Sequence, residues 1–206
     1  MASKGSDPAD RAELVPTAVK IIVAGGFGVG KTTLVGSVSE VPPLETEEYM
    51  TQASVGVDDL AGVENKHTTT VAMDFGRITI SADLVLYLFG APGQERFLFM
   101  WNDLVYGALG AVVLADTRRL EDCFLSVDFF ERYDIPFVVG VNCFHGVRDC
   151  GIEDVRAALD LDDSVPVILC DVRELSSSKD LLLALLESVQ SKARADPLPA
   201  AGAPVA

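Results

Sequence analysis

The stretch that decides the fold spans residues 19–33 and reads VKIIVAGGFGVGKTT. Its first half is a mostly apolar run rich in β-branched side chains, which is typical of a buried parallel strand. Its second half has the spacing G-x-x-x-x-G-K-[ST] and leads into a helical pattern over residues 31–38. A strand, a glycine-rich turn and a helix form the context in which this spacing binds phosphate, so the sequence predicts a phosphate-binding loop here.

The loop carries the chemical groups that a triphosphate needs. Its glycines let backbone N–H groups point at one anion, and the following helix adds the positive end of its dipole. We expect the Lys31 ammonium on the β- and γ-phosphates and the Thr32 hydroxyl on Mg²⁺. The residues expected at the nucleotide are Gly25, Gly26, Gly28, Val29, Gly30, Lys31, Thr32 and Thr33. The alternative is a glycine-rich turn with an incidental lysine, which leaves the full spacing unexplained.

Short apolar runs alternate with helical patterns along the chain. Strands are expected at residues 19–24, 71–75, 84–89, 111–115, 137–141 and 165–169, and helices at residues 31–38, 97–106, 120–132, 152–159 and 177–193. Such alternation is typical of right-handed βαβ units. The sequence therefore predicts an α/β fold with a doubly wound, mostly parallel six-stranded sheet, helices on both faces, and the ligand at the carboxyl ends of the strands.

The two ends of the chain differ in composition from its middle. Residues 1–17 are polar and small, and residues 194–206 are rich in alanine and proline, so both are interpreted as flexible tails. Residues 18–193 form the expected nucleotide-binding domain. Within it, residues 40–69 make an unusually long connection, which is either an enlarged first switch or a simple surface insertion.

Composition limits the partners that the protein can have. Its 206 residues include 16 Lys and Arg against 31 Asp and Glu, a formal charge of −15. So acidic a surface repels phosphate backbones, which argues against a nucleic-acid partner. The apolar runs are shorter than a bilayer requires, so no direct membrane insertion is expected. The four cysteines lack metal-ligand spacing and are interpreted as reduced thiols of a cytoplasmic protein.

A second motif, APGQERF at residues 91–97, follows the apolar run LVLYLFG. With the phosphate loop it resembles the Ras-like small GTPases, whose third motif is D-x-x-G-Q-E followed by an aromatic residue. The resemblance covers residues 19–193 and implies a small G-domain with the strand order 2-3-1-4-5-6 and one antiparallel edge pair. It implies that Gly93 offers its N–H to the γ-phosphate and that Gln94 orients the attacking water, so that Gln94 and Lys31 are the expected catalytic residues.

The segment TVAMDFG, which begins at Thr70, resembles the switch segment and second strand of the same family. The resemblance implies that Thr70 closes over Mg²⁺ together with Thr32, and over the γ-phosphate through its N–H. Plainer alternatives are a threonine-rich strand entry here and a Pro-Gly turn with a solvated glutamine at residues 91–97.

Three stretches, TTTVAMDFGR, LYLFGAPGQERF and GAVVLADTRRLEDCF, are closer still to the bacterial conservon-type small GTPases. This likeness implies two partners, a roadblock/LC7-type regulator and a membrane-associated sensor-kinase-like protein. Both partners come from the resemblance alone, because nothing in the composition indicates them.

Four features depart from the Ras-like pattern: the residue that opens D-x-x-G-Q, the base-reading motif N-K-x-D, the S-A-K motif that usually supports the base and is replaced by Cys170-Asp171-Val172-Arg173, and the spacing from Lys31 to Thr70. The aspartate that opens D-x-x-G-Q, which normally holds a water on Mg²⁺, is Gly90 in this chain. Asp74 or Asp116 could replace it if either strand end reaches the site, and otherwise both are ordinary carboxylates. The spacing from Lys31 to Thr70 is another departure: it is about twice that of Ras-like proteins, and residues 40–69 are interpreted as an enlarged first switch or as a simple surface insertion.

The base-reading motif N-K-x-D is altered to Asn142-Cys143-Phe144-His145. A neutral histidine has one acceptor nitrogen, whereas an aspartate accepts two hydrogen bonds from guanine, so base selectivity is expected to be weaker. Asn142, His145 and Cys170 are the expected base-side residues, with Asp171 as an alternative guanine contact. A histidine in an ordinary surface loop is the plainer alternative.

These residues favour a small regulatory switch that binds GTP and GDP with Mg²⁺ and hydrolyses GTP slowly until a partner accelerates it, with ATP not excluded. Arg77 and Arg96 are candidates for an arginine acting within the chain, although surface charge is the simpler interpretation of both. The alternative function is a nucleotide-binding scaffold of the same fold, in which Gly90 and His145 mark lost chemistry. A phosphate-loop kinase is disfavoured because no second substrate-binding segment is evident.

Overall fold

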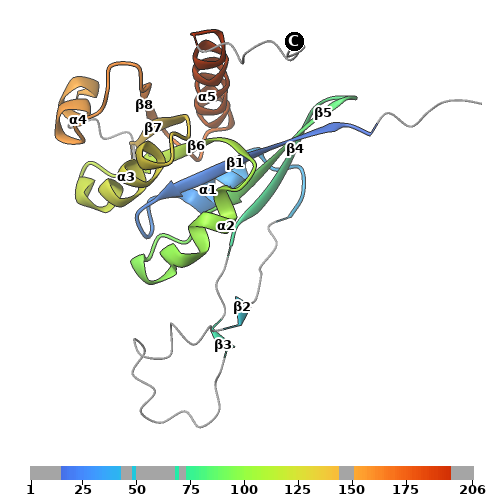
Figure 1. Ribbon diagram of the computed structural model, residues 1–206, viewed down its shortest axis with the longest axis horizontal. Coiled ribbons are helices and arrows are strands. Elements are labelled where there is room, and N and C mark those ends of the chain that lie inside the picture. Colours follow the sequence, from blue (N-terminus) through green and yellow to red (C-terminus); the bar gives the residue numbers. More distant parts are fainter. Residues whose placement is uncertain (1–14, 43–47, 50–67, 70–72, 144–150, 196–206) are drawn as a thin grey trace, which may run out of the picture.

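A six-stranded sheet in the order β4-β5-β1-β6-β7-β8 runs through the molecule (Figure 1). The structure, a computed structural model, describes residues 15–42, 48–49, 68–69, 73–143 and 151–195. The strands of the sheet are β1 (Thr17–Gly25), β4 (Phe75–Ser81), β5 (Leu84–Gly90), β6 (Ala108–Ala115), β7 (Phe137–Asn142) and β8 (Val167–Cys170). All neighbours are parallel except β4 and β5. The predicted fold class, strand order and antiparallel edge pair are therefore confirmed.

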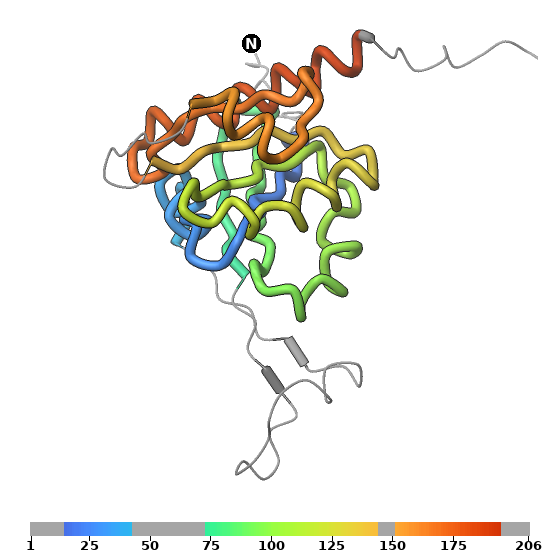
Figure 2. The backbone as a smooth tube through the Cα atoms, turned by 90° about the vertical axis from the view of Figure 1, so that its left-hand side faces the viewer, coloured from blue at the N-terminus to red at the C-terminus, as the bar shows by residue number. Residues whose placement is uncertain are grey.

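Helices cover both faces of the sheet (Figure 1). Their bounds are α1 (Lys31–Val38), η1 (Glu95–Met100), α2 (Trp101–Val105), η2 (Leu120–Cys123), α3 (Phe124–Arg132), α4 (Ile152–Ala158) and α5 (Leu175–Ala195). Helices α1 and α5 pack with one hydrophobic cluster, and α2, α3 and α4 pack with another. Figure 2 shows α5, in red, along one side of the molecule, and β1, in blue, through its middle.

The burial of β1 on both faces explains why its sequence is apolar at successive positions. Side chains alternate between the two faces of a strand, so Ile21 and Val23 join the cluster beneath α1 and α5, whereas Ile22 and Ala24 join the cluster on the opposite face. All of these side chains are fully buried. A strand between two helix layers cannot place a polar residue on either face without burying it.

Two predicted elements lie elsewhere than expected. The strand predicted at residues 71–75 is wrong in position, because β4 begins at Phe75 and continues to Ser81. Its length is set by antiparallel pairing with β5, which aligns Phe75 with Phe89 and Ser81 with Leu84. The helix predicted at residues 97–106 consists of the 3₁₀ turn η1 followed by the short helix α2.

Two short strands form a separate ladder within the long connection. They are β2 (Glu48–Tyr49) and β3 (Thr68–Thr69), and they pair antiparallel. The rest of residues 43–72 lies outside the described residues, so both interpretations of the connection at residues 40–69 stay open. Strand β1 begins at Thr17, the last residue of the segment interpreted as an N-terminal tail, and α5 continues to Ala195.

The carboxyl edge of the sheet collects the ends of five parallel strands. These ends are Gly25, Gly90, Ala115, Asn142 and Cys170. Because β4 runs antiparallel to β5, it brings its amino end to the same edge. The residues that precede β4 are therefore placed beside the residues that end the parallel strands.

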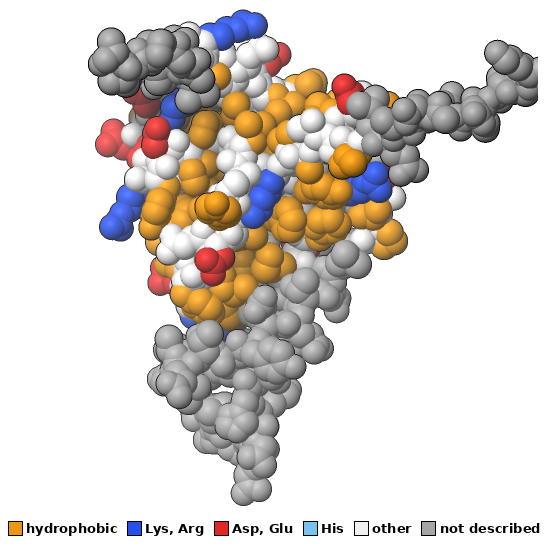
Figure 3. Space-filling view, turned by 45° about the vertical axis from the view of Figure 1, so that its right-hand side comes forward, with side chains coloured by type: hydrophobic (Ala, Val, Ile, Leu, Met, Phe, Trp, Pro, Cys, Tyr) orange, Lys and Arg blue, Asp and Glu red, His pale blue; other side chains and the backbone are white. Residues whose placement is uncertain are grey.

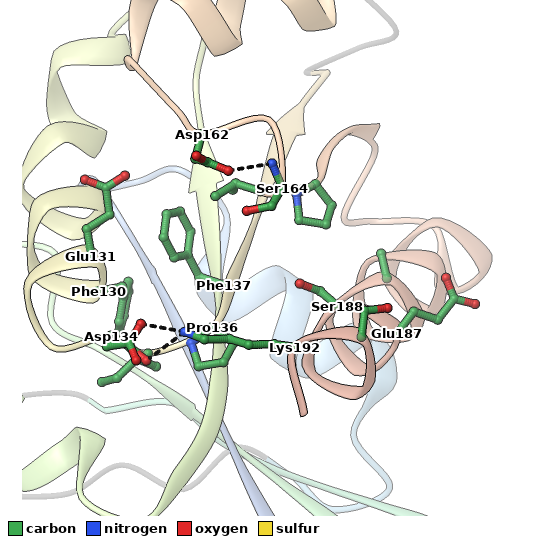
Figure 4. A pocket seen from close by; sticks show the side chains of 15 residues that line it. Phe130, Glu131, Asp134, Pro136, Phe137, Asp162, Ser164, Glu187, Ser188 and Lys192 are labelled. Carbon is green, nitrogen blue, oxygen red and sulfur yellow. Dashed lines mark hydrogen bonds and ion pairs between the residues drawn. The ribbon is translucent and has the colours of Figure 1, made fainter. Parts of the chain in front are cut away.

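A groove of about 800 Å³ lies at the opposite edge of the sheet, between α3 and α5 (Figure 4). Phe130, Pro136 and Phe137 contribute apolar surface to it, and the ion pair of Lys192 with Asp134 crosses one side. The groove is lined by α3, by the segments that enter β7 and β8, and by the second half of α5, so it lies at the amino ends of these strands and is remote from their carboxyl ends.

The outer surface mixes hydrophobic and charged side chains. On the face drawn in Figure 3, hydrophobic side chains cover much of the area, and the Lys and Arg side chains stand apart from one another. In the part of the chain that the structure describes, none of the helices combines the length and hydrophobicity that a bilayer crossing needs.

The packing of α5 on the sheet predicts a stability effect. Leu181 is fully buried against Gly140 of β7, whereas Leu183 on the same helix is 55% exposed. Replacement Leu181→Ala should lower the free energy of unfolding by about 2–5 kcal/mol, because it leaves a cavity under the helix. The control Leu183→Ala should change it by less than about 0.5 kcal/mol. Urea unfolding followed by circular dichroism measures both, and equal effects would contradict the packing.

Candidate functional site

The loop between β1 and α1 has left-handed backbone conformations, which favour glycine, at Gly25, Gly28 and Gly30, and two of these glycines are also closely surrounded. Gly25 has φ 127°, and a Cβ on it would lie 2.3 Å from the Leu114 carbonyl oxygen of β6. Gly30 has φ 110°, and a Cβ on it would lie 2.8 Å from Nδ2 of Asn142. Left-handed φ values with neighbours this close exclude larger residues. The loop is thus packed tightly between the ends of β6 and β7.

Lys31 lies at the centre of this loop. Its Nζ donates hydrogen bonds to the carbonyl oxygens of Gly25, at 2.9 Å, and Gly26, at 2.7 Å. Burial lowers the pKa of the Lys31 ammonium to about 8 from its usual 10.5, and the nearby Asp74 carboxylate partly opposes this change. An ammonium held by two neutral carbonyls in a partly buried position is a site where an anionic partner is electrostatically favoured.

The first turn of α1 has no side-chain cap, so its backbone N–H groups face the phosphate loop. Its N-cap residue is Gly30, which has no side-chain cap, and no acidic residue occurs in the first turn. Thr32 and Thr33 are both exposed there. Unpaired N–H groups and the helix dipole at this end favour a bound anion.

Gly93 brings the second motif against the loop. A Cβ on Gly93 would lie 2.6 Å from Nζ of Lys31 and 2.9 Å from the Gly25 carbonyl oxygen. Its backbone therefore runs directly past the Lys31 ammonium. The neighbouring Gln94 is exposed, and its Oε1 accepts a hydrogen bond from Nε of Arg96 at 2.9 Å.

The two candidate replacements for the acid missing at Gly90 have different surroundings. Oδ2 of Asp74 accepts a hydrogen bond from the Thr32 hydroxyl at 2.9 Å. Asp116 is buried at the end of β6, where Arg118 binds both of its carboxylate oxygens at 2.8 and 2.7 Å and holds its pKa below the usual range. Asp74 thus reaches the expected metal ligand, whereas the Asp116 carboxylate is engaged by an arginine.

The donor set at Thr32 suits Mg²⁺ in chemical type, because a hydroxyl and a carboxylate are hard oxygen groups. Among the described residues, no group of three or more His, Cys, Asp or Glu side chains is arranged to hold a metal ion. Mg²⁺ at such sites usually takes one or two protein ligands and completes its shell with phosphate and water. These residues therefore fit a cation that arrives with a nucleotide.

Asn142 fastens the phosphate loop to the neighbouring strand end. Its Nδ2 donates to the Val29 carbonyl oxygen at 2.9 Å, and its Oδ1 accepts from the Val172 N–H at 3.3 Å. Asn142 is buried, so each of these bonds is shielded from water. The side chain that was predicted near the base thus has a clear structural task, which is to join the loop to the segment after β8.

The remaining base-side residues are only partly described. The Cys170 carbonyl oxygen accepts a hydrogen bond from the Cys143 N–H at 2.7 Å, and burial raises the pKa of the Cys170 thiol to about 12. Asp171, the alternative guanine contact, is paired with Arg173. His145 and Thr70 lie outside the described residues, so both stay predictions.

The structure adds two residues that sequence reasoning missed. A guanidinium nitrogen of Arg119 donates to the Phe27 carbonyl oxygen at 3.1 Å, and Asp122 lies so close to Gly26 that a Cβ there would be 2.5 Å from the Asp122 Cβ. Both belong to the segment between β6 and α3. Nothing in the local pattern separates Arg119 from Arg118, which turns to Asp116 instead.

Arg77 and Arg96, the arginines considered from sequence, have other neighbours. Arg77 lies on β4, where its N–H donates to the Ser39 hydroxyl, and Arg96 holds Gln94. Neither contact joins an arginine to the phosphate loop.

Two comparisons concern the sequence. A family model described as "Conserved hypothetical ATP binding protein" matches residues 23–192. Among curated proteins, the uncharacterized protein MJ1339 of Methanocaldococcus jannaschii is 32% identical over 129 residues, which cover 60% of this chain and 69% of that protein.

Solved structures with a similar fold are G-domains of FeoB. The G domain of the T. maritima FeoB iron transporter is similar with a TM-score of 0.58 and 16% identity, over 84% of this chain and 100% of that one. The FeoB G-domain of Methanococcus jannaschii has a TM-score of 0.55 and 13% identity, over 84% and 99%. The apo cytosolic domain of T. maritima FeoB has a TM-score of 0.59 and 17% identity over 84% of this chain, which spans 65% of that domain. These similarities establish the G-domain fold.

The lowered pKa of Lys31 predicts how stability depends on pH. Between about pH 8 and 10.5 the unfolded chain keeps a proton that folded Lys31 has lost, so Lys31 contributes more to stability as pH rises through this range. As pH rises from about 8 to 10.5, the unfolding free energy of the wild type should therefore increase relative to that of Lys31→Met. Urea unfolding of the nucleotide-free protein at several pH values measures it. Lys179→Met, which removes an exposed lysine of α5, is the control, and a constant difference for Lys31→Met would contradict the burial of its charge.

Proposed function

The chain belongs to the family of conserved hypothetical ATP-binding proteins and has a G-domain fold, and from this premise we propose that it is a small regulatory nucleotide switch. It binds GTP or GDP with Mg²⁺ and hydrolyses the triphosphate slowly. Release of the γ-phosphate changes the segments that contact it, and this change is the signal.

The observation that carries this proposal is the convergence of the phosphate loop and Gly93 on the Lys31 ammonium. Nζ of Lys31 lies 2.9 and 2.7 Å from two loop carbonyl oxygens and close to the Gly93 backbone. When a phosphate binds here, the Lys31 ammonium donates to its charged oxygens instead of to neutral carbonyl oxygens. Hydrogen bonds between two charged groups are stronger than those with a neutral acceptor, by a factor of about two relative to neutral pairs. The same phosphate meets the free backbone donors of the first turn of α1.

Each side chain then has a distinct task in hydrolysis. Lys31 binds the β- and γ-phosphates, the Gly93 N–H points at the γ-phosphate, and Gln94 orients the attacking water. Thr32 and Thr70 would hold Mg²⁺, which when bound neutralises charge on the phosphate oxygens. The role of Lys31 costs little reorganisation, because the loop is already wrapped around its ammonium.

Slow turnover follows from the surroundings of Gln94. Its amide oxygen accepts from Arg96 and its side chain is exposed, so it must leave this bond before it can orient a water beside Lys31. A partner that engages Arg96 would free Gln94 and accelerate hydrolysis. The resemblance to conservon-type GTPases suggests a roadblock/LC7-type regulator and a sensor-kinase-like protein for this task, in the cytoplasm.

The base is the least constrained part of the proposal. Asn142 is committed to Val29 and Val172, and His145 replaces the aspartate that reads guanine in Ras-like proteins. The family description names ATP, whereas the structural relatives are G-domains. We therefore propose that the protein binds guanine nucleotides with a modest preference over adenine nucleotides. ATP is the competitor to test.

A nucleotide-binding scaffold of the same fold is the second candidate. The pairing of Gln94 with Arg96 and the absence of a side chain at Gly90 favour it, since both remove groups from the hydrolytic site. The two candidates share nucleotide binding and differ in whether hydrolysis occurs.

Two variants test binding and hydrolysis separately. Lys31→Ala should weaken binding of fluorescent GDP and GTP analogues by about tenfold to hundredfold, because it removes a charge-assisted contact. Gln94→Leu should keep this affinity and slow single-turnover GTP hydrolysis by at least about tenfold. Gln190→Leu, an exposed glutamine on α5, is the matched control. Unchanged affinity in Lys31→Ala would refute the phosphate site, and a wild type that binds but never hydrolyses would favour the scaffold.

The altered base motif predicts a gain of selectivity. His145→Asp should restore two acceptors for guanine, tighten GDP by about tenfold and increase its advantage over ADP. Calorimetry with GDP, ADP, GTP and ATP measures both effects. The control is His67→Asp, which changes the other histidine of the chain, and equal shifts in the two variants would remove His145 from the base site.

A further inference from the structure

We infer that Asp74, which precedes the edge strand β4, replaces the acidic residue absent at Gly90 and couples Mg²⁺ to nucleotide binding. The inference rests on the proposed function, since the cation arrives with a nucleoside di- or triphosphate. Asp74 acts as a positioning residue: its carboxylate accepts a hydrogen bond from the Thr32 hydroxyl and anchors the cation's hydration shell from the residue that precedes β4.

Backbone pairing places Asp74 beside Gly90. The Gly90 N–H donates to the Asp74 carbonyl oxygen at 2.8 Å, next to the last antiparallel pair of β4 and β5. Because β4 runs opposite to the other strands, the residue before it reaches the edge at which they end. An acid on either of these two adjacent backbones therefore faces the same end of the sheet.

The space between the two residues admits only one side chain. A Cβ on Gly90 would lie 2.8 Å from the Asp74 Cβ, 2.8 Å from its Oδ2 and 3.2 Å from its Cγ. Two Cβ atoms do not approach this closely, so one of the two positions must be glycine. The carboxylate of Asp74 thus fills the volume that a side chain at position 90 would enter.

The carboxylate is also directed at the correct group. Its Oδ2 lies 2.9 Å from Oγ1 of Thr32, the residue that follows Lys31 in the phosphate loop and that is expected on Mg²⁺. The same carboxylate lies near enough to Lys31 to oppose the effect of burial on the lysine. A hard anionic oxygen beside a hydroxyl ligand is the arrangement that holds a partly hydrated Mg²⁺.

The alternative acid has a different partner. Asp116 directly follows the parallel strand β6, but both of its oxygens bind Arg118, and the backbone N–H of Arg118 also donates to it. Releasing it would leave a buried carboxylate without this compensation. The geometry therefore favours Asp74 over Asp116.

Equilibrium binding tests the inference without using hydrolysis. The affinity for a fluorescent GDP analogue is measured in excess Mg²⁺ and in EDTA, and their ratio is the Mg²⁺ coupling. Asp74→Asn keeps the shape of the side chain and an oxygen acceptor for Thr32, so a purely structural role would survive it. We expect the coupling to fall by about tenfold or more, with the affinity in EDTA unchanged within about twofold.

A relocation variant provides the rescue. The double replacement Asp74→Gly with Gly90→Asp moves the acid to β5 while keeping one glycine in the pair, and it should recover most of the coupling. Asp103→Asn, which changes an exposed acid of α2, is the control and should leave the coupling intact. Thermal melting of each nucleotide-free variant verifies that it is folded.

The outcomes separate this inference from the proposed function. If the wild type binds no nucleotide in either condition, the proposed function fails and the inference fails with it. If the wild type shows Mg²⁺ coupling and Asp74→Asn keeps it, only the inference is overturned. Loss of coupling in Asp116→Asn but not in Asp74→Asn would assign the role to β6 and also overturn it.

Discussion

The close approach of the phosphate loop and Gly93 around the Lys31 ammonium is the constraint on which the rest of the site depends. The ammonium is held by two loop carbonyls, and a side chain at position 93 would collide with it. These contacts require the ends of β1 and β5 to lie side by side, which the parallel register of the two strands provides. The buried core on both faces of the sheet keeps that register. The hydrophobic clusters therefore fix the positions of the strand ends that carry the site.

Electrostatics explains how a protein with a formal charge of −15 can present a site for an anion. The long-range field opposes a nucleotide, but a partly buried ammonium and uncapped backbone donors act at contact distance, where screening by water is weak. Acidic groups near the loop have defined partners: Asp116 binds Arg118, and Asp122 pairs with Arg119, which also contacts the loop. Local pairing thus limits the repulsion that the composition implies.

The site keeps the features that hold phosphate and departs from the Ras-like pattern in those that read the base and anchor the metal. Asn142 joins the loop to the segment after β8, and His145 stands where Ras-like proteins have the aspartate that reads guanine. The aspartate lost from β5 has a counterpart on β4 that contacts Thr32. A switch and a scaffold both need the phosphate site. The physical difference between them is whether Gln94 can give up its hydrogen bond from Arg96 and bind the attacking water instead.

The sequence by itself determined the fold class, the bounds of α1 and the glycine-rich loop before it, because apolar runs and glycine spacing act locally. The strand order came from the resemblance to Ras-like small GTPases and not from any local pattern. The sequence misplaced β4, since a short apolar run at residues 71–75 stood out, whereas residues 75–81 mix polar and apolar side chains and are held as a strand by pairing with β5. The tertiary structure alone decided that Asp74 rather than Asp116 reaches Thr32 and that Arg119 contacts the loop. These contacts join residues that are remote in the chain. Asp74 reaches the carboxyl edge of the sheet because β4 runs antiparallel to β5, and no local sequence pattern shows the direction of a strand.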